Sequence, residues 1–150
     1  MKGVLQINYF WKLNIVSAIY AFFLFFSFEL QLNFYRIWRL SGWEANSVSL
    51  ITALLHIVGF LLLTLLVYMF DKKWMQDKKS KYWSSILWLP YLIIFLFIFA
   101  TLFPITYRGD DPAPASGLII FGQLIIYPFY LSFIYFIRYA IEGVTVEKVA

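Results

Sequence analysis

Four long apolar stretches, separated by short polar segments, constrain the fold of this chain more than any other feature. A helix rises about 1.5 Å per residue, so ~20 residues cross the ~30 Å of hydrocarbon in a bilayer. Each stretch is long enough for one crossing, and we expect an all-α integral membrane protein with four transmembrane helices in an antiparallel bundle. The expected helices cover residues 13–34, 48–70, 85–106 and 116–137.

The composition of the whole chain supports the membrane class. Of the 150 residues, 63% are hydrophobic and only 13% are charged. A soluble domain of this length needs a polar surface that so few charged residues cannot supply. The connections between the stretches are short, and none is long enough to fold alone, so we expect one transmembrane domain over residues 1–150.

The absence of cysteine removes several classes of function. The chain contains none, which excludes disulfides, thiol redox catalysis and thiolate metal sites. Quinone-linked disulfide-forming enzymes also use four-helix membrane bundles, but they require cysteine pairs. We therefore expect no cofactor and no metal.

The first apolar stretch follows Lys2 and Lys12, as the apolar part of a secretory signal follows its charged part. The stretch is too long for a signal peptide, and no pattern of small residues for cleavage follows it. We expect this segment to be retained as a transmembrane helix.

A cluster of lysines between the second and third stretches predicts the orientation. Cytoplasmic loops are enriched in lysine and arginine because these residues resist translocation. With this loop inside, alternation places both termini in the cytoplasm, and the basic residues then divide nine inside against three outside. The lysines of the loop are Lys72, Lys73, Lys78, Lys79 and Lys81.

The same lysine loop has a second interpretation, as a docking patch for anionic lipid or for a partner. Most basic residues flank apolar stretches, so we expect no nucleic-acid binding. The frequent phenylalanine, isoleucine and lysine residues are typical of an AT-rich genome. We expect a multi-pass protein of a cell membrane, namely a bacterial plasma membrane.

The two outer loops differ in character. Residues 32–47 are aromatic and basic, and we expect an interfacial continuation of the first helix that Ser41 and Gly42 interrupt. Residues 107–115 contain glycine and two prolines, which predict an exposed, solvated turn. Asp110 and Asp111 could hold a divalent cation weakly, but a plain solvated turn is favoured because such a cation takes about six or more oxygen ligands.

Four polar residues fall at similar depths in the four apolar stretches, and they form the candidate site. Glu29 and Thr101 lie ~8 Å from the outer ends of their helices, and His56 and Gln123 lie ~10 Å from theirs. Polar groups are costly in hydrocarbon and generally face other helices or a cavity. We expect one polar layer in the outer half of the membrane.

Three interpretations of this layer remain open. In the first, Glu29 and His56 form a proton-carrying pair in an outward-facing pocket that Thr101 and Gln123 complete. In the second, the four residues form hydrogen bonds between helices and only fix the packing. In the third, Glu29 reaches the interface and pairs with an arginine of the 32–47 segment.

Three classes of function follow. The first is an accessory, immunity or assembly factor that acts by packing its helices against a membrane partner, or against a second copy of itself, in the bilayer. The second is a component of a transporter or channel that uses the pocket around Glu29 and His56. The third is an enzyme acting at the outer face, although the sequence contains no recognisable catalytic motif and we assign no catalytic residue. The first class needs no catalytic group and is the one that the sequence favours.

Overall fold

The computed structural model describes residues 2–75 and 79–147, and the side-chain surroundings of residues 8–75 and 81–141. Helices dominate this part of the chain, and no strand occurs in it. In chain order the elements are α1 (Lys2–Leu32), α2 (Phe34–Ser41), α3 (Ala45–Trp74), the 3₁₀ helix η1 (Lys79–Trp83), α4 (Ser84–Leu102), the 3₁₀ helix η2 (Arg108–Asp110) and α5 (Pro114–Glu147).

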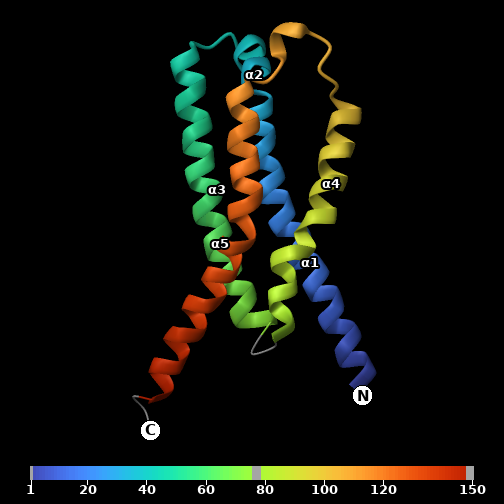
Figure 1. The fold of residues 1–150 in the computed structure, drawn as a ribbon, viewed down its shortest axis with the longest axis vertical. Helices are drawn as coiled ribbons and strands as arrows, with labels where there is room; N and C mark the ends of the chain where they lie inside the picture. The colour runs from blue at the N-terminus through green and yellow to red at the C-terminus, as the bar shows by residue number, and fades with distance from the viewer. Residues whose placement is uncertain (1, 76–78, 148–150) are drawn as a thin grey trace.

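Helices α1, α3, α4 and α5 are each long and apolar enough to cross a membrane, which confirms the predicted all-helical class with four membrane-length helices. Figure 1 shows these helices running in alternate directions, so that the two ends of the described chain lie at the same end of the bundle. The contacts agree: on α1, Tyr20 lies beside Phe70 near the end of α3, whereas Ser27 lies beside His56 near its beginning.

Helix α1 supplies more of the core than any other helix. In the most apolar 18-residue stretch of α1, 44% of the residues are buried. The corresponding share is 17% in each of the other three membrane-length helices. The buried residues recur about every four positions and so lie along one stripe, as expected for a helix with 3.6 residues per turn. They include Val16, Tyr20, Leu24 and Phe28. Helix α4 packs most extensively against α1.

The segment after α1 forms the short helix α2, in the region where an interfacial continuation was expected. The break between them is slight, because the Asn33 amide still bonds to the Glu29 carbonyl at 2.9 Å. Gly42 then ends α2 with φ +66°, a left-handed conformation that glycine adopts without steric cost.

The helix ends differ from the predicted ones for identifiable reasons. Helices α1 and α5 extend beyond their apolar stretches, because hydropathy marks the hydrocarbon crossing and not the end of helical hydrogen bonding. Helix α4 ends at Leu102 and not at residue 106, because Pro104 disfavours helical geometry at the residue before it. Helix α5 begins at Pro114. Proline suits this position because the amide groups of the first helical turn have no carbonyl partner within the helix.

Candidate functional site

His56 projects from α3 toward α1 and carries the most informative geometry of the predicted site. Its Nδ1 lies 2.7 Å from the carbonyl oxygen of Thr52, one turn earlier on α3. A carbonyl oxygen only accepts hydrogen bonds, so Nδ1 carries the proton and donates it. The other nitrogen, Nε2, lies 3.3 Å from the carbonyl oxygen of Ser27 and 3.4 Å from the amide nitrogen of Gln31.

Gln123 extends from α5 and bonds to Gln31 and Ser27 of α1, so a third helix contributes to the site. The Gln31 amide donates to Gln123 Oε1 at 3.0 Å, and the Gln123 amide donates to the Ser27 hydroxyl at 3.3 Å. The Gln31 amide also lies 3.2 Å from the Ser27 hydroxyl. We call Ser27, Gln31, His56 and Gln123 the polar cluster. It joins α1, α3 and α5 in the half of the bundle nearer α2.

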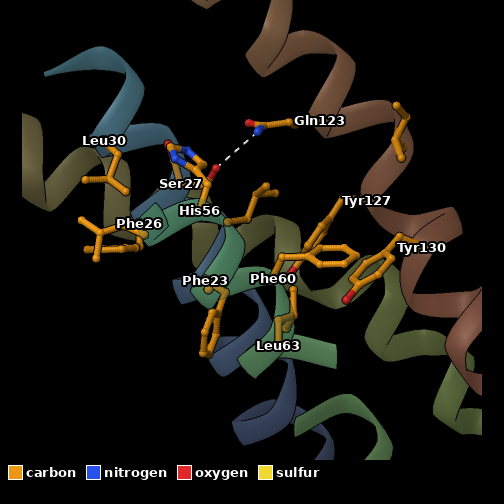
Figure 2. Close-up of a pocket in the computed structure, with 14 residues that line it drawn as sticks. Phe23, Phe26, Ser27, Leu30, His56, Phe60, Leu63, Gln123, Tyr127 and Tyr130 are labelled. Carbon is orange, nitrogen blue, oxygen red and sulfur yellow. Dashed lines mark hydrogen bonds between the residues drawn. The ribbon is translucent and has the colours of Figure 1, made fainter. Parts of the chain in front are cut away.

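A cavity of about 340 Å³ lies against the polar cluster, between the same three helices. Figure 2 shows Ser27, His56 and Gln123 along one side of it, and Phe60, Tyr127 and Tyr130 on the other. Pockets of roughly 300–1,000 Å³ typically accept small molecules. The walls are Phe23, Leu24, Phe26, Ser27, Leu30, Leu55, His56, Gly59, Phe60, Leu63, Gln123, Ile126, Tyr127 and Tyr130.

The polar atoms of the cavity gather at one end. Ser27, His56 and Gln123 lie toward the α2 end, and aromatic and aliphatic side chains form the rest of the wall. The hydroxyl of Tyr130 bonds to the hydroxyl of Thr64 at 2.6 Å, and that of Tyr127 donates to the Tyr20 carbonyl at 2.6 Å. These two tyrosines therefore present mainly their rings to the cavity.

The structure brings two of the four predicted site residues together and separates the other two from them. His56 and Gln123 belong to the polar cluster, joined through Ser27 and Gln31. Thr101 is exposed on α4, where its hydroxyl donates to the Phe97 carbonyl at 2.7 Å. This local bond satisfies the threonine without any second helix.

Glu29 is the other separated residue, and the expected Glu29–His56 pair does not form. Its carboxylate accepts a 2.6 Å hydrogen bond from Asn33, which in turn accepts one from Arg36 at 3.3 Å. Residues two apart on a helix lie on nearly opposite faces, so Glu29 cannot share the direction of Ser27 and Gln31. Asn33 thus bridges the Glu29 carboxylate and the Arg36 guanidinium by hydrogen bonds.

The loop between α4 and α5 is tied to α2 by ion pairs. Arg39 contacts both carboxylate oxygens of Asp110, at 2.8 and 2.7 Å, and its guanidinium lies 5.0 Å from the Tyr107 ring centre. Arg36 donates to the carbonyls of Phe103 and Pro104 at 2.9 and 2.5 Å. We call these contacts the outer clasp.

The electrostatics of the outer clasp follow from its geometry. The hydrogen bonds from Arg39 hold the pKa of Asp110 below its usual value, and the same bonds raise the pKa of Arg39. Only 1% of the Asp110 side chain is exposed. The expected solvated turn is therefore wrong at this position, because the arginines of a distant segment cover the carboxylate.

A second charged group lies at the opposite end of the bundle. The Asp71 carboxylate on α3 contacts Lys81 Nζ at 3.1 Å and also bonds to Arg138 Nε on α5. All three side chains are buried. We call Asp71, Lys81 and Arg138 the inner charge cluster.

The inner charge cluster changes the interpretation of the lysine loop. Lys81 is buried in an ion pair, whereas Lys72 and Lys73 are exposed. Lys78 lies outside the described residues, and so does the side chain of Lys79. The loop is thus not a uniformly solvated patch, because one of its lysines forms part of the protein interior.

Several of these functional candidates have only weak sequence signals. Asp71 stands among lysines at the end of an apolar stretch, where a surface residue is the ordinary expectation. Ser27 and Gln31 are four residues apart and so share a helix face, which is the signal that relates them to each other. Within the described chain, no group of three or more potential metal-binding side chains occurs.

Comparison with known proteins returns no match that assigns the chain to a family. No protein-family model, curated protein or solved structure matches it.

Proposed function

We propose that this small membrane protein binds a lipid-soluble molecule in the cavity between α1, α3 and α5. The observation that carries the proposal is the cavity itself, which combines apolar walls with a polar cluster at one end. Such a combination is typical of sites that bury the body of a ligand and orient it by a few polar contacts.

The position of the cavity favours a ligand that is dissolved in the bilayer. Phe60 on α3 and Ile126 on α5 line it and are 55% and 64% exposed. Both lie on helices that are apolar enough to cross a membrane, so the outer side of this edge faces hydrocarbon. A molecule can therefore enter between α3 and α5 without passing through water.

Binding is better supported than passage through the bundle. The half of the bundle beyond the cavity is filled by Tyr20, Leu131 and Tyr135, none of which has measurable exposure. A transporter or channel needs a route through both halves, and these side chains occupy it in this conformation. An outer-face enzyme needs a paired acid and base, and the separation of Glu29 from His56 removes the strongest candidate pair.

Filling the cavity tests the proposal. Gly59→Leu is the filling variant, because nothing lies within 4 Å of a Cβ built at Gly59 and the residue lines the cavity. Gly117→Leu is the matched control, since Gly117 is exposed on α5, has equally open surroundings and is not part of the wall. The probe is a photoreactive hydrocarbon without a polar head, added to vesicles that contain the protein.

We expect the photoproducts to concentrate on peptides that carry Phe60 and Tyr127. Gly59→Leu should reduce this labelling severalfold, and Gly117→Leu should leave it unchanged. Labelling spread evenly over the apolar surface, or insensitive to Gly59→Leu in a folded protein, would overturn the proposal.

A second candidate function is an accessory factor that packs against a membrane partner or a second copy of itself. The observation in its favour is that only four residues of the 30-residue helix α3 are buried: Val48, Leu63, Val67 and Asp71. Exposed apolar side chains such as Leu54, Ile57 and Leu61 on α3 can contact another helix. Photocrosslinking from Ile57, which is exposed on α3, to a single protein would favour this function, and crosslinks to lipid alone would count against it.

A further inference from the structure

The hydrogen-bonding groups at the polar end of the cavity specify the kind of head group that fits there. His56 donates from Nδ1 to the Thr52 carbonyl, so in the neutral ring Nε2 is an acceptor. The Ser27 carbonyl near Nε2 cannot donate to it, and the Gln31 amide approaches only to 3.4 Å. His56 therefore presents an acceptor that lacks a short hydrogen bond.

The Ser27 hydroxyl has the opposite property, because it is a donor without an acceptor among the described groups. It accepts hydrogen bonds from the amides of Gln31 and Gln123, but among the described groups none accepts its own proton. Other hydroxyls on these helices donate to a carbonyl one turn earlier, as Ser17 does to Leu13 and Thr64 to Phe60. The Ser27 proton is thus available for a further acceptor.

The charge of the wall limits the ligand further. None of the residues that line the cavity is an aspartate, glutamate, lysine or arginine. With the His56 ring neutral, a charged head group buried here would have no counter-ion, which is strongly unfavourable in a low-dielectric environment. The head group must therefore be neutral.

We propose that the cavity binds an uncharged lipid alcohol, with its hydroxyl at the polar cluster and its chain along the aromatic wall. A hydroxyl is both a donor and an acceptor. It can donate to His56 Nε2 in place of the long 3.4 Å hydrogen bond from the Gln31 amide, and it can accept from Ser27. A carbonyl or ether head could accept from Ser27 but could not replace the long Gln31–His56 hydrogen bond with a shorter one.

The rest of the cavity suits the chain of such a molecule. Phe60, Leu63 and Tyr127 lie on the side away from the polar cluster, as Figure 2 shows. The Tyr130 and Tyr127 hydroxyls are already bonded to Thr64 and to the Tyr20 carbonyl, so this part offers little to a second polar group. The occupant therefore has one polar end and one apolar body.

This inference rests on the proposed function, and its experiment separates the two. Three probes carry the same photoreactive alkyl chain but end in an alcohol, in a methyl ether or in a sulfonate. Each is added to vesicles containing the full chain, and labelling of the cavity peptides is measured by mass spectrometry. We expect the alcohol to label about three- to tenfold more strongly than the ether, which is the effect of one hydrogen bond. The sulfonate should label least.

Two substitutions identify the partners of the hydroxyl. His56→Leu removes the acceptor, and Ser27→Ala removes the donor; each should lower labelling by the alcohol to the level of the ether while labelling by the ether changes little. Gly59→Leu should reduce labelling by the alcohol and the ether together, and Gly117→Leu should change neither. Using both His56→Leu and Ser27→Ala keeps the test decisive if one variant fails to fold.

The outcomes distinguish the two proposals. Equal labelling by alcohol and ether, or strong labelling by the sulfonate, overturns the lipid-alcohol inference while cavity labelling by the headless hydrocarbon still supports the binding function. An alcohol preference that survives both His56→Leu and Ser27→Ala in folded protein also overturns the inference. Failure of every probe to label the cavity overturns both proposals.

Discussion

The hydroxyl of Tyr20 on α1 lies 3.0 Å from the hydroxyl of Tyr135 on α5, and both side chains are fully buried. The Tyr135 hydroxyl also lies 2.7 Å from the Ser84 hydroxyl at the start of α4. Three helices thus meet in one chain of hydroxyls. Hydrocarbon offers no hydrogen-bond partner, so each of these groups must find its partner within the protein.

Replacing Tyr20 by phenylalanine should weaken the junction of α1 with α5 without changing the fold. The ring remains in the core and one interhelical hydrogen bond is lost, which typically costs about 0.6–1 kcal/mol in membrane proteins. Tyr139→Phe is the control, because Tyr139 is 67% exposed on the same helix as Tyr135. Thermal unfolding in detergent micelles, followed by circular dichroism, measures the difference. A Tyr20→Phe protein as stable as the control would contradict the expectation.

Replacing Asp71 by asparagine should destabilise the protein far more than the loss of a tyrosine hydroxyl. The substitution leaves Lys81 and Arg138 buried without their carboxylate, and breaking a buried ion pair in this way costs about 3–5 kcal/mol. Lys73→Gln, an exposed change two residues along α3, should have little effect. Unfolding in micelles measures both variants, and a loss below about 1 kcal/mol for Asp71→Asn would argue against a structural role for the cluster.

Replacing Asp110 by asparagine should release the outer clasp. The variant loses its ion pair with Arg39, so we expect faster amide hydrogen exchange in α2 at neutral pH, with the four long helices unaffected. Asp111→Asn is the matched control, because Asp111 is the exposed neighbour of the buried carboxylate. Equal exchange in the two variants would show that the clasp does not restrain α2.

The same contact predicts a pH dependence of defined sign. The pKa of Asp110 is lowered in the folded protein, so its ion pair contributes stability above its unfolded-state pKa and loses that contribution as pH falls through the lowered value. The protection of the α2 amides, measured relative to their intrinsic exchange rate at each pH, should therefore fall at acidic pH in the native protein. The Asp110→Asn variant should lack this acid-dependent component, and its presence there would assign the effect to another group.

Cysteine scanning should establish which end of the bundle faces the cytoplasm. The chain has no cysteine of its own, so a single introduced thiol reports its side without background. With both termini inside, a membrane-impermeant maleimide should label Asn46→Cys and Asp111→Cys in intact cells, and Lys73→Cys only after lysis. Labelling of Lys73→Cys in intact cells would invert the proposed orientation.

The predicted cluster shows how far sequence reasoning reached. Depth along each helix follows from counting residues, and it placed His56 and Gln123 at similar levels; in the structure both side chains lie within hydrogen-bond distance of Gln31. The direction in which a side chain points depends on how each helix rotates in the bundle. Glu29 stands at a similar depth to Ser27 and Gln31 but points to another face, and there Asn33 bonds it. Depth alone could not reveal this difference.

The charged clusters show a different limit. Asp71, Lys81 and Arg138 come from three separate segments, and Arg39 and Asp110 come from two. No local pattern relates the members of either group. The positive-inside rule explains the lysine loop as a whole, and it gave no reason to expect that one lysine turns inward. Ion pairs between distant segments become visible only when the helices are placed side by side.

The sequence by itself determined that this chain has four membrane-length helices, because hydrophobicity and length are local properties that hydrocarbon selects directly. It also determined the break at Gly42, because the backbone freedom of glycine is intrinsic to that residue. Only the tertiary structure decided which polar groups meet, which remain unpartnered and where a cavity is left. Those outcomes depend on the rotation and packing of helices against one another. Many sequences with the same apolar pattern would pair different polar groups and leave a cavity elsewhere.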